Sequence, residues 1–339
     1  MMLNQRFGKQ LVLLTLLLLA GLALLWTPFW GVKQIEFAAL LNSDSQTTDW
    51  LIFWKIRVPR TIVAFLAGAA LGCCGMVFQS MFRNPLATPF TLGVSSGASL
   101  GAATYVWLGF TFGFLGISGM TLFAFLGAML TILIVWGLTQ LRGSFSTTTM
   151  LLAGVAVSFF CASLILFLQY LSDFAQAFRI LRWLMGGLEI LGFDSVLGLM
   201  PVILGGVLIL AILRHELNLL ATGEDLAASR GVAVRKVRTV LFLVTSLMVG
   251  AVVAICGPIG FVGMMAPHIC RLLTGWDHRY LLPATFLFGG TFLTVCDSFA
   301  RTLIAPAEIP VGIITALLGG PFFVWLLISS PYTKRGFFD

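Results

Sequence analysis

Residue types that carry out covalent chemistry are few and scattered in this sequence. His215, His268 and His278 stand far apart and have no metal-binding spacing. None of the six cysteines forms a Cys-x-x-Cys pair, and all lie in or at the edges of apolar segments, so we expect them to be small apolar packing residues. They are Cys73, Cys74, Cys161, Cys256, Cys270 and Cys296. The sequence therefore predicts no catalytic residues, no metal site and no cofactor bound by this chain.

Basic residues form the first pattern that could bind something. The stretch KIRVPRTIVAF, residues 55–65, places Lys55, Arg57 and Arg60 directly before an apolar stretch that runs to Met81. Lys and Arg usually flank a membrane helix on its cytoplasmic side. A guanidinium also pairs well with a carboxylate through two parallel hydrogen bonds. If these residues face the cytoplasm, they are ordinary flanking charges. If they face the outside, an acidic partner there would explain them.

The composition indicates a membrane protein. Of the 339 residues 59% are hydrophobic and only 10% are charged, which is more apolar surface than a soluble protein of this size could bury. The net charge of +7 fits basic loops beside anionic lipid headgroups, and no nucleic-acid-binding pattern accompanies it. The Leu-rich start of the chain lacks a small-x-small cleavage site, so we interpret it as a first membrane span.

Ten apolar segments are long enough, or nearly so, to cross a bilayer, which needs roughly 20 residues. We predict spans at about 11–30, 61–81, 91–108, 114–139, 149–170, 193–213, 239–256, 258–274, 281–299 and 311–329. The Gly257-Pro258 pair separates the seventh from the eighth by a tight reversal. The predicted fold is an all-α polytopic membrane protein with a single transmembrane domain over residues 1–339.

The distribution of Lys and Arg predicts the orientation. With both termini in the cytoplasm, the inner side holds thirteen basic residues: Arg6, Lys9, Arg83, Arg142, Arg214, Arg230, Arg235, Lys236, Arg238, Arg271, Arg279, Lys334 and Arg335. The outer side holds seven: Lys33, Lys55, Arg57, Arg60, Arg179, Arg182 and Arg301. This asymmetry supports cytoplasmic termini. It also places the arginines of the first pattern outside the cell.

An internal repeat predicts that the chain is a transporter. Residues 68–85 match residues 250–267 with Gly, Ala, Cys, Gly and Pro at five common positions. The two copies lie in the second and seventh spans, which are five helices apart and must therefore run in opposite directions. Inverted repeats of this kind are typical of transporters, here spans 2–5 and 7–10. The segment FRNPLATPFTLGVSSGAS, residues 82–99, carries Pro85 and Pro89, which forbid a continuous helix, so we expect it to line the pathway.

The segment 214–238 is the longest predicted connection on the cytoplasmic side. It is amphipathic, and Glu224 and Asp225 suit the first turn of a helix. It is either a solvated basic loop or a pair of short helices offered to a cytoplasmic partner. The sequence contains no Gly-x4-Gly-Lys-Ser/Thr loop for ATP phosphates, so an ATP-driven mechanism would need ATP and Mg bound by another subunit.

The chain resembles the FecCD-type permeases of bacterial importers for iron-siderophores, haem and vitamin B12. The resemblance runs from about residue 50 to 330 and rests on long motifs such as RVPRTIVAFLAGAALGCCGMVFQSMFRNPLATPF, GEDLAASRGV, GPIGFVGMMAPHICR and EIPVGIITALLGGPFFVWLL. It implies a type II permease of an ATP-binding-cassette importer in the bacterial cytoplasmic membrane. The implied partners are a second permease copy, identical or similar, two cytoplasmic ATPases and a periplasmic or lipoprotein substrate-binding protein. The cargo that we expect is a ferric siderophore, with vitamin B12 or haem as alternatives.

The resemblance also implies roles for particular residues. Outer-rim arginines of similar proteins pair with glutamates of the binding protein, and they match Arg57, Arg60 and Arg301; Asp297, four residues before Arg301, is placed to steady it. The cytoplasmic gate matches Asn84, Leu86, Thr147 and Thr148. The ATPase-coupling residues match Leu219, Gly223, Glu224, Ala227 and Gly231. At Arg230 the sequence departs from the Leu usual in similar proteins.

Two other classes of protein fit less well. An ion-coupled secondary transporter would also have inverted repeats, but it should carry Asp, Glu or His in the middle of its spans. Here Gln79 and Gln169 lie near span ends and Asp297 lies near the outer edge. A membrane enzyme would need clustered carboxylates, histidines or a metal site, and the sequence shows no such cluster.

Overall fold

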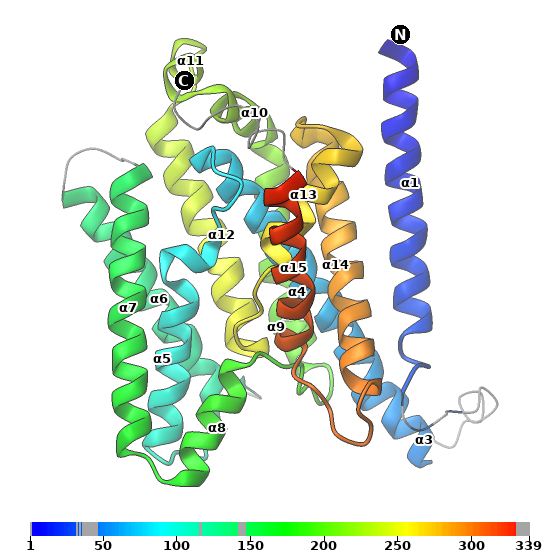
Figure 1. The fold of residues 1–339 in the computed structure, drawn as a ribbon, viewed down its shortest axis with the longest axis vertical. Coiled ribbons are helices and arrows are strands. Elements are labelled where there is room, and N and C mark those ends of the chain that lie inside the picture. Colours follow the sequence, from blue (N-terminus) through cyan, green and yellow to red (C-terminus); the bar gives the residue numbers. More distant parts are fainter. Residues whose placement is uncertain are drawn as a thin grey trace.

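The computed structural model describes residues 2–31, 33, 35, 47–114, 117–141 and 147–329, and ten apolar helices make up most of this part of the chain (Figure 1). They are α1 (Met2–Trp26), α4 (Val58–Phe82), α5 (Val94–Trp107), α6 (Gly119–Leu141), α7 (Thr147–Leu171), α9 (Asp194–Ile212), α12 (Val234–Cys256), α13 (Val262–Thr274), α14 (His278–Thr302) and α15 (Val311–Ser329). Each overlaps one predicted span in the same order. The all-α membrane fold is confirmed.

The predicted lengths need correction for two of these helices. Within the described residues, seven helices are long and apolar enough to cross a membrane alone. Helices α5 and α13 have only 14 and 13 residues, whereas α15 begins and ends at the predicted residues 311 and 329, with Val311–Leu326 as a shorter apolar part. The reason lies in the chain before α5 and α13. Residues 83–88 and 257–261 are non-helical, because prolines at 85 and 258 and Gly257 in a left-handed conformation (φ +67°) interrupt the helical path.

Shorter elements cluster at the two ends of the bundle (Figure 1). At one end, named the α8 end, lie α3 (Thr48–Leu51), the π-helical turn η1 (Ile52–Arg57), α8 (Phe174–Leu184) and a hairpin that pairs β1 (Gly113–Phe114) with β2 (Ile117–Ser118). At the opposite α10 end lie α10 (Arg214–Thr222), α11 (Glu224–Ser229) and the start of α1. A 3₁₀ turn, η2 (Pro89–Leu92), leads into α5.

Helix α8 was not predicted as a separate element. It is amphipathic, and its start is a capping box in which Asp173 accepts a hydrogen bond from the Gln176 backbone N–H while the Gln176 side chain accepts one from the Asp173 N–H. The residues Asp-x-x-Gln were therefore a signal for this helix start. The basic residues Arg179 and Arg182, expected in an outer loop, lie on this helix.

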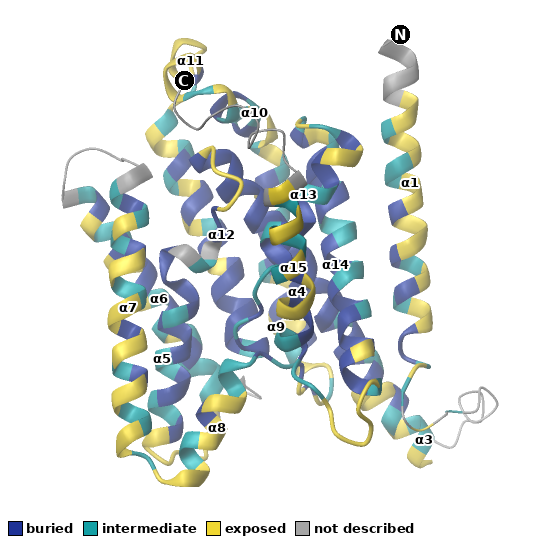
Figure 2. Cartoon of the chain, in the orientation of Figure 1, coloured by how far each residue is buried: buried dark blue, intermediate teal, exposed yellow. Residues whose placement is uncertain are grey.

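Helix α4 forms the centre of the bundle and packs against α9, α12, α13 and α14. Figure 2 shows it almost wholly buried, whereas α1 and α7 expose much of their apolar surface. Glycines allow this close packing. A Cβ added at Gly75 would lie 1.7 Å from the carbonyl oxygen of Gly263 in α13, and one at Gly68 would lie 2.2 Å from the carbonyl oxygen of Gly289 in α14.

The two copies of the repeat run in opposite directions, as predicted. Helix α4 runs from the α8 end to the α10 end, and α12 starts beside α11 and runs back (Figure 1). The copies differ in continuity, because α4 continues through Gly75 while α12 ends one residue before Gly257. The six cysteines are buried and free, as the apolar-packing interpretation expected.

Candidate functional sites

The three arginines expected to dock a binding protein lie at the α8 end, and all three are buried. Arg57, at the end of η1, donates hydrogen bonds to the carbonyl oxygens of Pro28 (3.1 Å), Phe29 (3.3 Å) and Lys33 (2.6 Å). Gly31 lies against this guanidinium, since an added Cβ there would be 2.5 Å from it. Arg57 therefore holds the described residues just after α1, and both of its terminal nitrogens donate within the chain.

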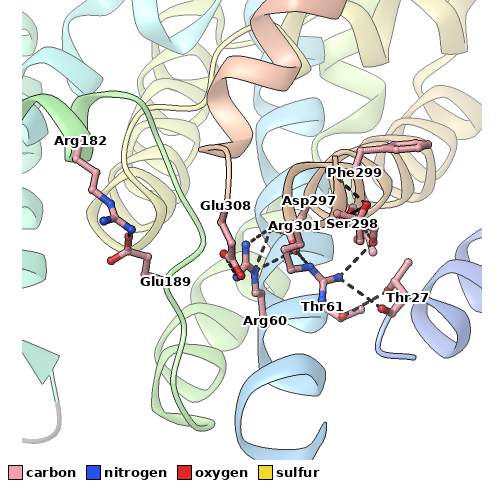
Figure 3. Close-up of polar contacts among 12 residues, drawn as sticks. Thr27, Arg60, Thr61, Arg182, Glu189, Asp297, Ser298, Phe299, Arg301 and Glu308 are labelled. Carbon is pink, nitrogen blue, oxygen red and sulfur yellow. Dashed lines mark hydrogen bonds and ion pairs between the residues drawn. The ribbon is translucent and has the colours of Figure 1, made fainter. Parts of the chain in front are cut away.

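Arg60 and Arg301 converge on one carboxylate, Asp297, in the close-up of Figure 3. Arg60 donates from Nε to both Asp297 oxygens at 3.1 Å and from Nη2 to Oδ1 at 2.9 Å. The Arg301 Nε lies 3.1 Å from Asp297 Oδ2, which confirms that Asp297 steadies Arg301 one helical turn away. Asp297 is only 1% exposed. A buried carboxylate with two guanidinium partners is strongly held, because each charge would be costly to bury alone.

One further carboxylate completes this group of charges. Glu308, in the connection between α14 and α15, accepts a hydrogen bond from Arg60 Nη1 at 2.7 Å, and its side chain is 50% exposed. Arg60, Asp297, Arg301 and Glu308 thus form a group with two positive and two negative charges, named the outer charge cluster because the predicted orientation places it outside the cell. Only Glu308 brings it to the surface. The sequence interpretation did not single out Glu308, since its partner Arg60 lies far away along the chain.

A small cavity opens beside the outer charge cluster. Its volume is about 240 Å³, and it lies between α8, the α8–α9 connection and the start of α15. Arg60 and Glu308 line one side, and Arg182 and Glu189 line another with an ion pair of 2.6 Å between them. The cavity therefore has charged groups of both signs at its walls (Figure 3).

Two predicted gate residues form a turn directly after α4. Arg83 ends the helix in a left-handed conformation (φ +49°), and the Asn84 side-chain oxygen accepts a hydrogen bond from the Leu86 backbone N–H at 2.9 Å. This turn presents Leu86 with 51% of its surface exposed. Thr147 and Thr148 begin α7, but their side chains lie outside the described part of the structure. The gate as a set of four residues stays a prediction.

The segment 214–238 contains a pair of short helices, one of the two forms that its sequence allowed. Gly223, in a conformation with φ +136°, separates α10 from α11, and Gly231, with φ +84°, ends the pair before α12. Leu219 in α10 and Ala227 in α11 are buried. The Glu224 carboxylate pairs with buried Arg238 at 2.6 Å, which fixes the start of α11 onto α12. Whether a partner binds this face stays a prediction.

Within the described residues, ten apolar helices, broken entries to α5 and α13, an antiparallel repeat and a helical pair at one end form the membrane fold that the sequence predicted. Among the described residues no group of three His, Cys, Asp or Glu could hold a metal ion. Residues 13–329 match the profile of the FecCD transport family. The chain belongs to this family, and it is a permease of an ATP-binding-cassette importer.

Relatives of known name support the same assignment. The hemin transport system permease protein HmuU of Yersinia pestis is 36% identical over 98% of this chain and 100% of its own length. The vitamin B12 import system permease protein BtuC of Klebsiella pneumoniae is 39% identical over 96% of this chain and 93% of its own. A solved metal-chelate type ABC transporter in an inward-facing conformation is 31% identical, with a TM-score of 0.82 over 95% of this chain and 100% of that chain.

Proposed function

We propose that this permease moves a metal chelate, foremost a ferric siderophore, across the bacterial cytoplasmic membrane. The observation that carries the choice is the likeness in fold and sequence to a metal-chelate type transporter. Haem and vitamin B12 are the alternatives, because relatives of similar identity carry those names. The outer charge cluster is neutral as a set, so it gives no reason to prefer an anionic over a neutral chelate.

The proposed assembly has a second permease copy, two cytoplasmic ATPases and an outer binding protein. ATP and Mg would be held by the ATPases, and both termini of this chain would face the cytoplasm together with α10 and α11. Exposed apolar side chains on α7, such as Phe159 and Phe160, suit lipid or the second copy. Access would alternate, with the outer side open to the binding protein and the turn at Asn84 and Leu86 closing the inner side.

Uptake into proteoliposomes tests the cargo and the energy source together. The permease, its ATPase and its binding protein would be reconstituted, and uptake of a radioiron-labelled ferric siderophore, haem and cyanocobalamin would be compared with ATP inside or absent. We expect ATP-dependent uptake of the ferric siderophore above the other two. ATP-dependent uptake of haem or cyanocobalamin alone would replace the cargo proposal. Uptake that persists without ATP and stops when the proton gradient collapses would overturn the importer mechanism.

The structure changes how docking by the arginines can be tested. Reversing the charge of Arg60 would unpair buried Asp297 and so damage the fold as well as the docking surface. Glu308→Gln instead removes the exposed carboxylate that occupies Arg60 Nη1. If carboxylates of the binding protein pair with Arg60, this variant should bind that protein more tightly, because the competing charge is gone.

A matched control separates this effect from a general loss of negative charge. Asp49→Asn also removes a carboxylate from an outer ion pair, the one with Lys33, which lies outside the outer charge cluster. We expect Asp49→Asn to leave binding unchanged and Glu308→Gln to tighten it, with the difference reduced at high salt. Equal binding by Glu308→Gln and the unmodified chain would contradict docking through Arg60.

A further inference from the structure

A buried histidine at the start of α14 connects three helices at the α10 end. The side chain of His278 is 1% exposed, and its ring lies between α4 and α10. The Nε2 atom is 2.8 Å from Ser80 Oγ in α4, and the Nδ1 atom is 2.6 Å from Asn218 Oδ1 in α10. The His278 backbone N–H also donates to Asn218 Oδ1 at 3.0 Å. One residue therefore joins the segment 214–238 to the central helix α4.

The neighbouring carboxylate determines where the protons of this network lie. Asp277 accepts hydrogen bonds at Oδ1 from Asn218 Nδ2 and from the Arg279 backbone N–H, both at 3.0 Å. Burial raises the pKa of Asp277, but these hydrogen bonds, together with the nearby Lys9 charge, outweigh burial and hold its pKa below the ordinary value. A charged carboxylate only accepts, so the Asn218 amide nitrogen faces Asp277 and its oxygen faces His278. The His278 proton is therefore on Nδ1, and the Nε2 of the neutral ring accepts from Ser80.

The Ser80 hydroxyl has one proton and two acceptors within reach. Besides His278 Nε2, it lies 2.9 Å from the carbonyl oxygen of Met76 in its own helix. While Asn218 holds the ring in place, the hydroxyl can donate across to α14; if the ring moves away, it can fold back on Met76. Ser80 is near the end of α4, and the turn of Asn84 and Leu86 follows directly. The network thus ends next to the proposed gate.

The residues on either side of Ser80 are also held from other helices. Gln79 accepts a hydrogen bond from Arg271 of α13. The Met81 carbonyl oxygen accepts one from Arg238 Nη2 of α12 at 3.4 Å, and Arg238 in turn pairs with Glu224 of α11. The last turn of α4 is therefore linked to the helical pair by two routes, through Asn218 in α10 and through Glu224 in α11.

We propose that Asn218 and His278 are positioning residues that transmit a displacement of α10 to the end of α4 and so to the turn of Asn84 and Leu86. The role in transport rests on the proposed function, in which an ATPase acts on α10 and α11. The physical linkage between α10 and the end of α4 does not rest on the proposed function, because its hydrogen bonds all lie within this chain. The two parts can therefore be tested separately.

Hydrogen exchange on the purified chain in lipid nanodiscs tests the linkage. Asn218→Ala should speed exchange in α10 and also at residues 80–87, by roughly three- to tenfold, the range expected when one or two buried hydrogen bonds are lost. Ser80→Ala should have the reciprocal effect on α10. Ser229→Ala is the control, because within the described residues that hydroxyl donates only to the Leu226 carbonyl oxygen of its own helix α11. Changes confined to α10 in Asn218→Ala, with no effect of Ser80→Ala on α10, would overturn the linkage.

The reconstituted complex tests the use of the linkage in transport. For the cargo that the uptake panel identifies, we would measure molecules moved per ATP hydrolysed in Asn218→Ala, Ser80→Ala and the double variant. Each single variant should lower this ratio while ATP hydrolysis continues. The ratio in the double variant should be no lower than in the single variants, because both substitutions interrupt the same hydrogen-bonded path. Additive losses, or an unchanged ratio in chains that do show the exchange effect, would overturn the role in coupling. Absence of ATP-dependent uptake by the unmodified complex would instead refute the proposed function and leave the exchange result standing.

Discussion

Replacing Asp297 by Asn is the most direct test of the outer charge cluster. The substitution keeps the shape of the side chain and one carbonyl oxygen but removes the charge that faces Arg60 and Arg301. Three hydrogen bonds from Arg60 and the contact with Arg301 Nε meet at this carboxylate, which is 1% exposed. Loss of one partner from a buried ion pair costs about 3–5 kcal/mol. Because Arg60 keeps its bond to Glu308, we expect a loss of about 3 kcal/mol.

Reversible unfolding in mixed micelles, by titration with a denaturing detergent, would measure the free energy of unfolding. Glu308→Gln is the matched control, since it removes the other carboxylate from the same Arg60, but from a half-exposed position. Exposed ion pairs contribute about 1 kcal/mol or less. The two variants should therefore differ by about 2 kcal/mol, although each removes one negative charge from the cluster.

A second substitution checks the cause of the loss. Asp297→Asn combined with Arg301→Met removes the buried cation that the first change leaves without a carboxylate. We expect the double variant to recover part of the lost stability, because an unpaired buried charge costs more than an apolar group of similar size. A loss below about 1 kcal/mol for Asp297→Asn, or no recovery in the double variant, would refute the reasoning that buried charge pairing holds this site.

Two further predictions concern the close packing of α4 against α13 and the turn that follows α4. Gly75→Ala should destabilise the chain, because the new methyl group would lie 1.7 Å from the carbonyl oxygen of Gly263. Gly205→Ala is the control and should not destabilise it, because no atom lies close to that position. Equal thermal stability of both variants would contradict the close approach at Gly75. Asn84→Ala should speed amide exchange at Leu86 roughly fivefold by removing its acceptor, and Asn84→Asp, which keeps an acceptor, should not. Slow exchange in Asn84→Ala would show that the turn does not depend on this hydrogen bond.

Local patterns in the sequence predicted most of the fold. Each apolar segment of about 20 residues became a helix, because a backbone in lipid must satisfy its hydrogen bonds internally. The Gly257-Pro258 pair predicted the break between α12 and α13. Gly257 adopts a left-handed conformation, and Pro258 has no backbone N–H to continue a helix. The pair of short helices in 214–238 was likewise one of the forms that its own sequence allowed.

Helix α8 and the surroundings of the arginines show the limit of that reasoning. A short amphipathic helix lacks the hydropathy of a span, so α8 was not predicted, although its capping box was readable. Docking of a binding protein by Arg57, Arg60 and Arg301 stays a prediction, and the burial of these three residues was not foreseen. Burial depends on which helices pack together, and hydropathy of a segment does not contain that information.

By itself the sequence determined the number and order of the apolar helices, the opposite direction of the repeat and the absence of an ATP-binding loop of the Gly-x4-Gly-Lys-Ser/Thr form. Only the tertiary structure decided which charges meet. Arg60 and Asp297 are 237 residues apart and share hydrogen bonds, and Ser80 and His278 meet across 198 residues. The physical reason is that a buried polar group needs a partner wherever packing brings one, and in a helical bundle that partner comes from a neighbouring helix with no fixed separation along the chain.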